Sequence, residues 1–231
     1  MIDWHSHVLP GIDDGSQNIE ESVALLKMLS EQGVDTVVAT PHFIADNEAA
    51  AHFLERRQRA FDELHGHLQP EFPRIIQGAE VKYYPGISRM EGLDRLTIGE
   101  SGLLLLEMPM MKWTEYTVRE VIELSHSMHL KVVLAHIDRY WTLQSKDVWS
   151  RFYENEILMQ VNADFFLGFL TKGKAMNLLR NGAIHFLGSD CHNLTSRQPR
   201  IGQAFSYIEK KFGCDFLSQM HEYGMEMLMT K

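Results

Sequence analysis

Six short apolar runs along this chain each end in a histidine, an aspartate or a glutamate, and this repeated pattern limits the possible folds more than any other feature. The residues at these ends are His5, His42, Glu80, Glu107, His136 and Asp190. One polar residue after a strand is ordinary, because loops are polar. Six residues of the types that bind metal ions or transfer protons indicate parallel strands whose carboxyl ends meet at one site.

The segments between these runs have the apolar spacing of helices. Strands are predicted near residues 2–5, 34–39, 74–79, 103–106, 131–135, 157–161 and 183–187. Helices are predicted over residues 18–30, 47–68, 114–128, 145–153, 171–181, 198–212 and 216–229. Strands that alternate with helices indicate parallel strands joined by right-handed crossovers. A site at the ends of many strands favours a closed barrel over an open sheet, here with seven strands.

The 231 residues suffice for one large α/β domain, and we expect residues 1–231 to form a single domain because no linker, repeat or low-complexity tract divides them. The longest apolar stretch is far shorter than a membrane span. No basic segment with an apolar signal core opens the chain, so we expect a cytoplasmic protein without membrane insertion. The two cysteines, Cys191 and Cys214, fit a reducing compartment.

The charge of the chain bears on its partners. The net charge is −9, from 22 basic and 31 acidic residues. This balance disfavours binding to nucleic acid or to anionic membranes. An anionic substrate would therefore need bound cations, or arginines at the mouth of its site.

The opening residues carry the most specific group of candidate metal ligands. His5 and His7 lie two residues apart, so in a strand both side chains point to the same face and can bind one ion. The turn at residues 10–11 then returns the chain, which allows Asp13 or Asp14 to approach the same ion. A pair of histidines alone is weak evidence, and the other strand ends supply the context.

The motifs at the strand ends are His5-Ser6-His7 with Pro10-Gly11-Ile12-Asp13-Asp14-Gly15, Thr40-Pro41-His42, Gly78-Ala79-Glu80, Glu107-Met108-Pro109, Ala135-His136-Ile137-Asp138-Arg139 and Ser189-Asp190-Cys191-His192-Asn193. Together they resemble the polymerase and histidinol phosphatase (PHP) superfamily. Within it the chain looks like the bacterial capsule-biosynthesis tyrosine phosphatases, which depend on manganese. The resemblance covers essentially the whole chain.

This resemblance implies a fold and a site. The fold would be a distorted (β/α)7 TIM-like barrel with a trinuclear metal centre at the C-terminal ends of the strands. The implied metal ligands are His5, His7, Asp14, His42, Glu80, Glu107, His136, Asp190 and His192. Arg139 and Arg197 match the positions that hold the phosphate. The resemblance favours Asp14 as the ligand, and Asp13 is then expected to be a turn residue or a support for a ligand.

The implied ligands comprise five imidazoles and four carboxylates. This set of nitrogen and oxygen donors suits manganese, iron or zinc, and it lacks the thiolates of structural zinc sites. Three divalent ions carry six positive charges against four negative carboxylates, and the resulting +2 would favour an anionic ester. A metal-activated hydroxide is expected to attack phosphorus while the other ions and the arginines stabilise the phosphoryl oxygens. The general acid for the leaving group is left open between Asp138, Tyr140 and a metal-bound water.

The leading interpretation is a metal-dependent protein-tyrosine phosphatase that hydrolyses a phosphotyrosine protein, namely a cognate bacterial tyrosine kinase of capsule or exopolysaccharide synthesis. The substrate rests on the resemblance alone. One alternative is a small-molecule phosphatase such as a histidinol phosphatase, which would need a closed pocket. Another is a phosphodiesterase or exonuclease, which the acidic balance disfavours. A non-enzymatic, metal-stabilised interaction module would need coordinatively saturated ions.

Residues 191–197 also match the Cys-x5-Arg spacing of phosphatases that use a cysteine thiolate as nucleophile. Two features argue against that chemistry here. The loop lacks the glycines that allow backbone N–H groups to converge on a phosphate. Cys191 also lies between Asp190 and His192, so strand alternation turns it away from the face that they share.

Two further hypotheses concern residues outside the ligand set. His185 lies inside an apolar run and is expected to be a core histidine with a satisfied hydrogen bond. Residues 108–113 follow Glu107 and are candidates for an apolar wall that would suit a phosphotyrosine ring. Aromatic residues elsewhere would extend this wall, namely Tyr83, Tyr84, Tyr140 and Trp141.

Overall fold

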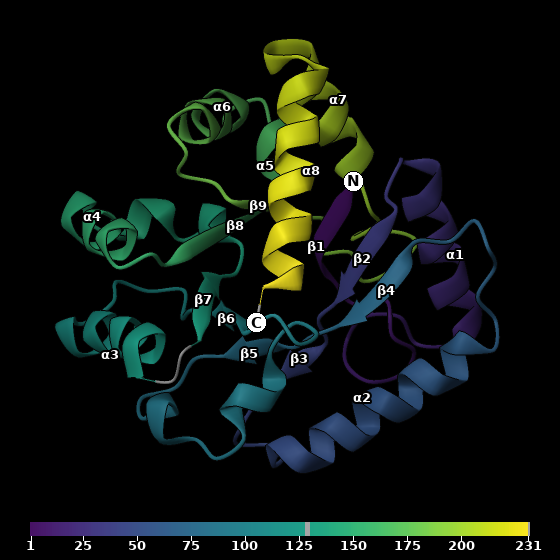
Figure 1. Ribbon diagram of the computed structural model, residues 1–231, viewed down its shortest axis with the longest axis horizontal. Helices are drawn as coiled ribbons and strands as arrows, with labels where there is room; N and C mark the ends of the chain where they lie inside the picture. The colour runs from purple at the N-terminus through teal and green to yellow at the C-terminus, as the bar shows by residue number, and fades with distance from the viewer. Residues whose placement is uncertain (128–129, 231) are drawn as a thin grey trace.

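The computed structural model describes residues 1–127 and 130–230, in which parallel strands alternate with helices (Figure 1). The described strands are β1 (Ile2–Ser6), β2 (Thr36–Ala39), β3 (His42–Phe43), β4 (Arg74–Gln77), β5 (Glu80–Lys82), β6 (Leu103–Glu107), β7 (Lys131–Leu134), β8 (Leu158–Asn162) and β9 (Phe186–Gly188). Every predicted strand region contains one of these strands.

Two predicted strand regions each continue into a second short strand. β3 follows β2 after a break around Pro41, and β5 follows β4 after a break around Gly78. Proline has no backbone N–H to donate to a ladder, which explains the first break. The two segments stay paired across these breaks. The Gly78 N–H donates to the Ala39 carbonyl (2.8 Å), and the Glu80 N–H donates to the Pro41 carbonyl (3.0 Å). The seven predicted regions therefore give nine strands among the described residues.

All the strand pairings are parallel, in the orders β1-β2-β4 and β3-β5-β6-β7-β8-β9. Because β3 and β5 extend β2 and β4, the second sheet continues the first around the molecule. The segment after β9 then returns to β1, where the Asp190 N–H donates to the His5 carbonyl (2.7 Å) and the His7 N–H donates to the Cys191 carbonyl (2.9 Å). The curled parallel sheet is a distorted TIM-like barrel, as predicted.

The seam between β1 and β9 requires a close approach of two backbones. A Cβ atom at Gly188 would lie 2.5 Å from the Cβ of His5, so a larger residue would force the strands apart. The buried carboxylate of Asp3 ties the same segments, because its Oδ1 accepts the Ser189 N–H (2.7 Å) and the His5 N–H (3.3 Å). The seam therefore fixes His5 beside the residues that follow β9.

Helices connect the strands and cover the outside of the barrel (Figure 1). They are α1 (Ile19–Glu31), α2 (Ala50–His65), α3 (Glu115–Ser127), α4 (Lys146–Glu154), α5 (Asp164–Leu167), α6 (Lys172–Arg180), α7 (Ile201–Phe212) and α8 (Cys214–Met229). The predicted helices are confirmed, although the end expected at Met128 lies outside the described residues. The apolar spacing does not predict α5, since a helix of about one turn has no repeat. No helix in the described part of the chain is both long and apolar enough to cross a lipid bilayer.

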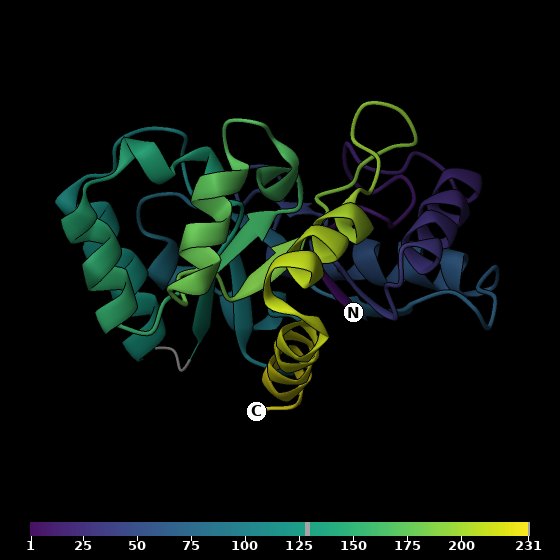
Figure 2. The ribbon, with the colours of Figure 1, turned by 90° about the horizontal axis from the view of Figure 1, so that it is seen from above.

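Helix α8 closes the end of the barrel at which the strands begin (Figures 1 and 2). Ile2 and Trp4 belong to the apolar cluster inside the barrel, and Met225 and Leu228 of α8 pack against that cluster. Gly224 allows the helix to approach closely, because a Cβ atom there would lie 2.8 Å from Cδ1 of Ile2. With this end closed, polar side chains meet at the opposite end, where the strands finish.

Candidate metal centre

The predicted ligands lie at the carboxyl ends of the strands, on the face of the barrel away from α8. His5 belongs to β1, His42 to β3, Glu80 to β5, and Glu107 is the last residue of β6. The remaining predicted ligands follow strands or lie in the adjoining loops, namely His7, Asp14, His136, Asp190 and His192. In Figure 2 these loops gather on the upper side of the molecule and α8 lies on the lower side.

The structure brings these side chains together in three overlapping groups. Within each group one donor atom per residue lies within 4.8 Å of every other. The groups are His7 with Asp14, His42 and His192; His5 with His7 and Asp190; and His42 with Glu80 and Glu107. His136 stands outside these groups, but its Nε2 lies 2.8 Å from Glu80 Oε1 and 3.7 Å from Glu107 Oε1. All the predicted ligands therefore share one site.

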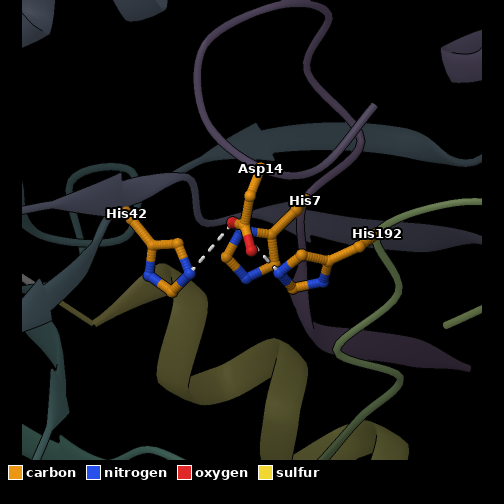
Figure 3. A group of neighbouring side chains, drawn as sticks. All are labelled: His7, Asp14, His42 and His192. Atoms are coloured by element: carbon orange, nitrogen blue, oxygen red, sulfur yellow. Dashed lines mark ion pairs between the residues drawn. The ribbon is translucent and has the colours of Figure 1, made fainter. Parts of the chain in front are cut away.

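Asp14 reaches the first group from the loop after β1 (Figure 3). Its Oδ1 lies 3.3 Å from His42 Nε2 and 3.4 Å from His192 Nε2. The His7 ring packs against the same two histidines, with its centroid 3.8 Å from that of His192 and 4.6 Å from that of His42. These spacings suit one cation, because metal–ligand bonds of about 2.0–2.2 Å place the donor atoms of a single ion roughly 3–4 Å apart.

The two histidines of the opening motif are held with their Nε2 atoms facing each other. His7 Nδ1 lies 2.7 Å from Asp13 Oδ2, and His5 Nδ1 lies 3.2 Å from the amide oxygen of Gln160. When each ring carries a single proton, as a metal ligand must, these acceptors hold that proton on Nδ1 and leave a lone pair on Nε2. The two Nε2 atoms are only 3.2 Å apart. A cation between them removes the repulsion, and a carboxylate behind a ligand histidine is the usual support for such an ion.

Asp13 therefore takes the supporting role, one of the two that the sequence left open. Its carboxylate also accepts the backbone N–H groups of His42 (2.9 Å) and Gly15 (2.9 Å). Burial would raise the pKa of Asp13, but these bonds and the one with His7 lower it below its usual range. The charged carboxylate thus orients His7 and fixes the start of β3.

The charged groups inside the cluster shift one another's pKa values. Burial would raise the pKa values of Glu80 and Asp190, but the charge of His5 and the bonds to other histidines hold both well below the usual range. His192 behaves in the opposite way, because burial and the neighbouring His7 lower its pKa to about 4. Its imidazole is therefore neutral near pH 7 and its nitrogen lone pair is available.

Several donor atoms in the cluster have no hydrogen-bond partner among the described residues, although they are buried. They are Glu80 Oε2 and His192 Nε2, and His136 Nδ1, the ring nitrogen other than the one that faces Glu80, is unpaired as well. An unpaired buried polar atom is costly, so a functional explanation is needed. Carboxylate oxygens and imidazole nitrogens without thiolates are the donors that manganese, iron or zinc accept. The residues present therefore fit divalent cations.

Backbone strain also marks the site. His136 has φ of 32° and Asp190 has φ of 52°, in the left-handed region that favours glycine. Among the described residues other than glycine, only Glu156 shares this feature. Such strain costs about 1–3 kcal/mol per residue and is found mainly where function requires it.

Two residues of β8 that the sequence motifs did not predict support the cluster. The amide oxygen of Gln160 accepts the backbone N–H of His136 (2.6 Å) as well as facing His5. The Asn162 side chain donates to Asp190 Oδ2 (2.8 Å). A signal for both was present, because polar residues two apart in an apolar run point to the same face of a strand.

Arg139 and Arg197 lie at the rim of the cluster. Arg139 ends a short 3-10 helix (Ile137–Arg139), and its guanidinium donates to Asp190 Oδ2. Arg197 Nη2 donates to Asp190 Oδ1 (2.9 Å), and its Nη1 lies 3.7 Å from Asp14 Oδ2. Their side chains are 35% and 36% exposed. Both can therefore reach an anion that approaches the cluster from solvent.

The thiol of Cys191 is buried in the apolar core, as strand alternation predicts. Burial, with the nearby Asp3 carboxylate, raises the pKa of this thiol. A neutral and inaccessible thiol is a poor nucleophile. The Cys-x5-Arg match is therefore a coincidence of spacing.

The hypothesis of an aromatic wall is wrong for three of its residues. Tyr83, Trp113 and Tyr140 are buried, and each makes an internal hydrogen bond. The Tyr140 hydroxyl donates to the Ala135 carbonyl, which also removes it as a candidate general acid. The position of these aromatic residues after strands did not show whether their side chains lie in the core or at the site, because residues of both kinds follow strands.

Comparisons with known proteins agree with this architecture. The chain matches the family described as Capsular polysaccharide synthesis, CpsB/CapC, over residues 1–229. It is 33% identical over 233 residues to the tyrosine-protein phosphatase CpsB of Streptococcus pneumoniae, covering 92% of this chain and 91% of that protein. It is 26% identical over 242 residues to the tyrosine-protein phosphatase YwqE of Bacillus subtilis, covering 99% of this chain and 91% of that protein.

The fold is shared with a solved structure. Crystal structures of YwqE and CpsB, described as metal-dependent tyrosine phosphatases, include a chain that superposes with a TM-score of 0.85 and 24% identity. The superposition covers 100% of this chain and 95% of that chain. The family match extends over nearly the whole sequence, and the chain therefore belongs to the CpsB/CapC family of capsular polysaccharide synthesis.

Proposed function

We propose that this protein is a metal-dependent protein-tyrosine phosphatase, a phosphoric monoester hydrolase that acts on phosphotyrosine in proteins. The observation that carries the proposal is the buried cluster of imidazoles and carboxylates whose unpaired donor atoms fit divalent cations. Two arginines stand beside this cluster, where they can bind a phosphate. The relatives CpsB and YwqE are named tyrosine-protein phosphatases, which supports the same activity here.

The proposed metal centre contains three divalent cations, with manganese as the expected metal and iron or zinc as alternatives that suit the same donors. The residues that would hold them are His5, His7, Asp14, His42, Glu80, Glu107, His136, Asp190 and His192. When bound, such cations polarise phosphoryl oxygens and lower the pKa of bound water, which supplies a nucleophile near neutral pH.

The protein's own groups position the substrate. Arg139 and Arg197 donate N–H groups to the phosphoryl oxygens and stabilise the negative charge that develops on them. Asn162 holds Asp190 in place, so that the two arginines have a fixed anchor. The buried thiol of Cys191 takes no part, and no phosphorylated cysteine forms.

The shape of the site supports a protein substrate over a small metabolite. Asp14 is 63% exposed, and the two arginines lie on the rim of the cluster. An open rim allows a phosphotyrosine to reach the cluster while it is still part of a polypeptide. We propose a bacterial tyrosine kinase of capsule synthesis as the substrate, residues 1–231 as a single phosphatase domain, and the cytoplasm as the compartment, which suits the free thiols of Cys191 and Cys214.

The test is release of inorganic phosphate from a phosphotyrosine peptide and from histidinol phosphate, measured side by side. The protein is stripped with a chelator and assayed before and after manganese is added back. We expect manganese to restore activity, and this activity to be higher on the peptide than on histidinol phosphate. A preference for histidinol phosphate would move the assignment to a small-molecule phosphatase, and no activity on either substrate would contradict phosphatase function.

A further inference from the structure

A polar cavity of about 250 Å³ opens beside the metal cluster on the side of Asp190. Three arginines line it, namely Arg139, Arg197 and Arg200, together with Asp164 and Asp190. This concentration of cations is unusual in a chain whose net charge is −9. Two of the arginines are explained by the proposed binding of the phosphate, and Arg200 is not.

Arg200 differs from the other two arginines in its partner. Arg139 and Arg197 both donate to Asp190, which is almost completely buried. Arg200 Nη1 instead lies 3.1 Å from Asp164 Oδ1, and these side chains are 44% and 68% exposed. An exposed ion pair contributes only about 0–1 kcal/mol. An incoming anion can therefore replace the Asp164 carboxylate at little cost.

The cavity also places Arg200 at a suitable position relative to the reacting group. Asp190, the two phosphate-binding arginines and Arg200 all line this cavity. A phosphotyrosine at the cluster would thus bring a neighbouring residue of its own chain to Arg200. The planar guanidinium binds carboxylates and phosphates through paired N–H groups.

We infer that Arg200 is a specificity-determining residue that binds an acidic group flanking the phosphotyrosine of the substrate. The group is a carboxylate or a second phosphate ester, and it exchanges with Asp164 for the guanidinium. The inference rests on the proposed phosphatase function. It extends that function by naming the class of substrate as phosphotyrosine segments with an adjacent negative charge.

The test compares peptides that differ at a single position. Phosphotyrosine peptides carry Glu, Gln or phosphoserine at one of the two positions before or after the phosphotyrosine. kcat/KM is measured with manganese-loaded full-length protein, and p-nitrophenyl phosphate, which has no flanking residue, reports the amount of active protein in each preparation. The variants are Arg200→Gln and Arg200→Lys. The matched control is Arg151→Gln, which removes an arginine from an exposed ion pair with Glu115 on α3.

The wild type is expected to prefer the Glu peptide over the Gln peptide by roughly fivefold at one flanking position, mainly through KM, as suits one partly exposed charged hydrogen bond. Arg200→Gln should lose this preference, Arg200→Lys should keep part of it, and Arg151→Gln should keep all of it. A larger preference for the phosphoserine peptide would identify a second phosphate as the ligand.

Equal rates for the Glu, Gln and phosphoserine peptides at every position, or an undiminished preference in Arg200→Gln, would overturn the inference while leaving the phosphatase function intact. If the wild type hydrolysed neither the peptides nor p-nitrophenyl phosphate, the proposed function itself would be contradicted.

Discussion

The side chains of the cluster depend on neighbours that the ligand motifs do not include. Gln160 is fully buried, and its amide oxygen faces both His5 Nδ1 and the backbone N–H of His136. It therefore fixes the tautomer of one proposed ligand and the strained backbone of another. Hydrogen-bond partners behind metal ligands typically change metal affinity or activity by 10–100-fold when they are replaced.

Gln160→Leu is accordingly expected to lower manganese affinity or kcat/KM by roughly 10–100-fold. Gln160→Glu keeps an acceptor oxygen at the same place but loses the N–H that Gln160 donates to the Val161 carbonyl (2.7 Å), so it is expected to recover only part of this loss. Metal affinity is measured by titration of stripped protein, and circular dichroism confirms that both variants fold. If the leucine variant binds manganese and turns over like the wild type, Gln160 does not position the ligands.

A substitution at Cys191 tests whether its sulfur atom takes part in the reaction. Because its thiol is buried and protonated, we expect Cys191→Ser to retain most of the phosphatase activity, within roughly threefold, with a small loss of stability from the buried hydroxyl. Phosphate release from the phosphotyrosine peptide measures this. A loss of activity in a folded variant would restore the cysteine mechanism.

At the scale of elements, the apolar runs predicted the position of every strand region and most helix bounds to within a few residues. They did not predict the breaks near Pro41 and Gly78, because apolar spacing reports neither the missing N–H of Pro41 nor the pairing between distant segments. The pattern of His, Asp or Glu at the ends of apolar runs located six of the nine proposed ligands, whereas Asp14 and His192 rested on the family resemblance. That pattern did not locate Gln160 or Asn162 of β8, because it considered only histidines, aspartates and glutamates and both of these residues are amides.

The β1–β9 seam gives a prediction about one glycine. In Gly188→Ala the new Cβ would lie 2.5 Å from His5 Cβ and 2.8 Å from Gln160 Nε2, so the strands must move apart. We expect a loss of about 1–3 kcal/mol in the free energy of unfolding, together with weaker metal binding. Urea unfolding with and without manganese measures both effects.

Gly173→Ala is the matched control, because that glycine lies in α6 and a Cβ there meets nothing within 4 Å. Alanine should leave stability unchanged or raise it by up to about 1 kcal/mol, as expected for an exposed helical position. Equal effects of the two substitutions would show that the seam is not tightly packed.

The start of β9 gives a prediction about pH. His185 Nδ1 accepts the backbone N–H of Met159 (3.0 Å), a role that only the neutral ring can fill, and burial lowers the pKa of His185 to about 4. Above pH 6.5 the ring is neutral in both the folded and the unfolded chain. As the pH falls toward 4 the unfolded chain binds the proton first, so the free energy of unfolding decreases, by up to about 3 kcal/mol.

His185→Asn keeps an acceptor for the Met159 N–H but cannot be protonated. The difference in the free energy of unfolding between this variant and the wild type should therefore grow in favour of asparagine between pH 6.5 and pH 4. Urea titrations at several pH values measure the difference. A difference that does not vary with pH would contradict the assigned neutral ring.

At the scale of the whole molecule, the barrel closes one end with α8 and collects its buried charges at the other. Parallel strands make this separation possible, because all of their carboxyl ends point to the same face. A set of acidic and imidazole groups this dense is tolerated inside a protein when cations complete it. We therefore expect bound divalent metal and phosphotyrosine hydrolysis to depend on the same cluster.

The most direct measurement is a titration of manganese into chelator-stripped protein, with metal bound per chain and phosphate release from a phosphotyrosine peptide recorded on the same samples. We expect activity to rise from baseline as the three groups fill, and His136→Ala to remain at least roughly 100-fold less active at every manganese concentration. Full activity in the stripped protein, or manganese binding that saturates without any phosphate release, would contradict this expectation.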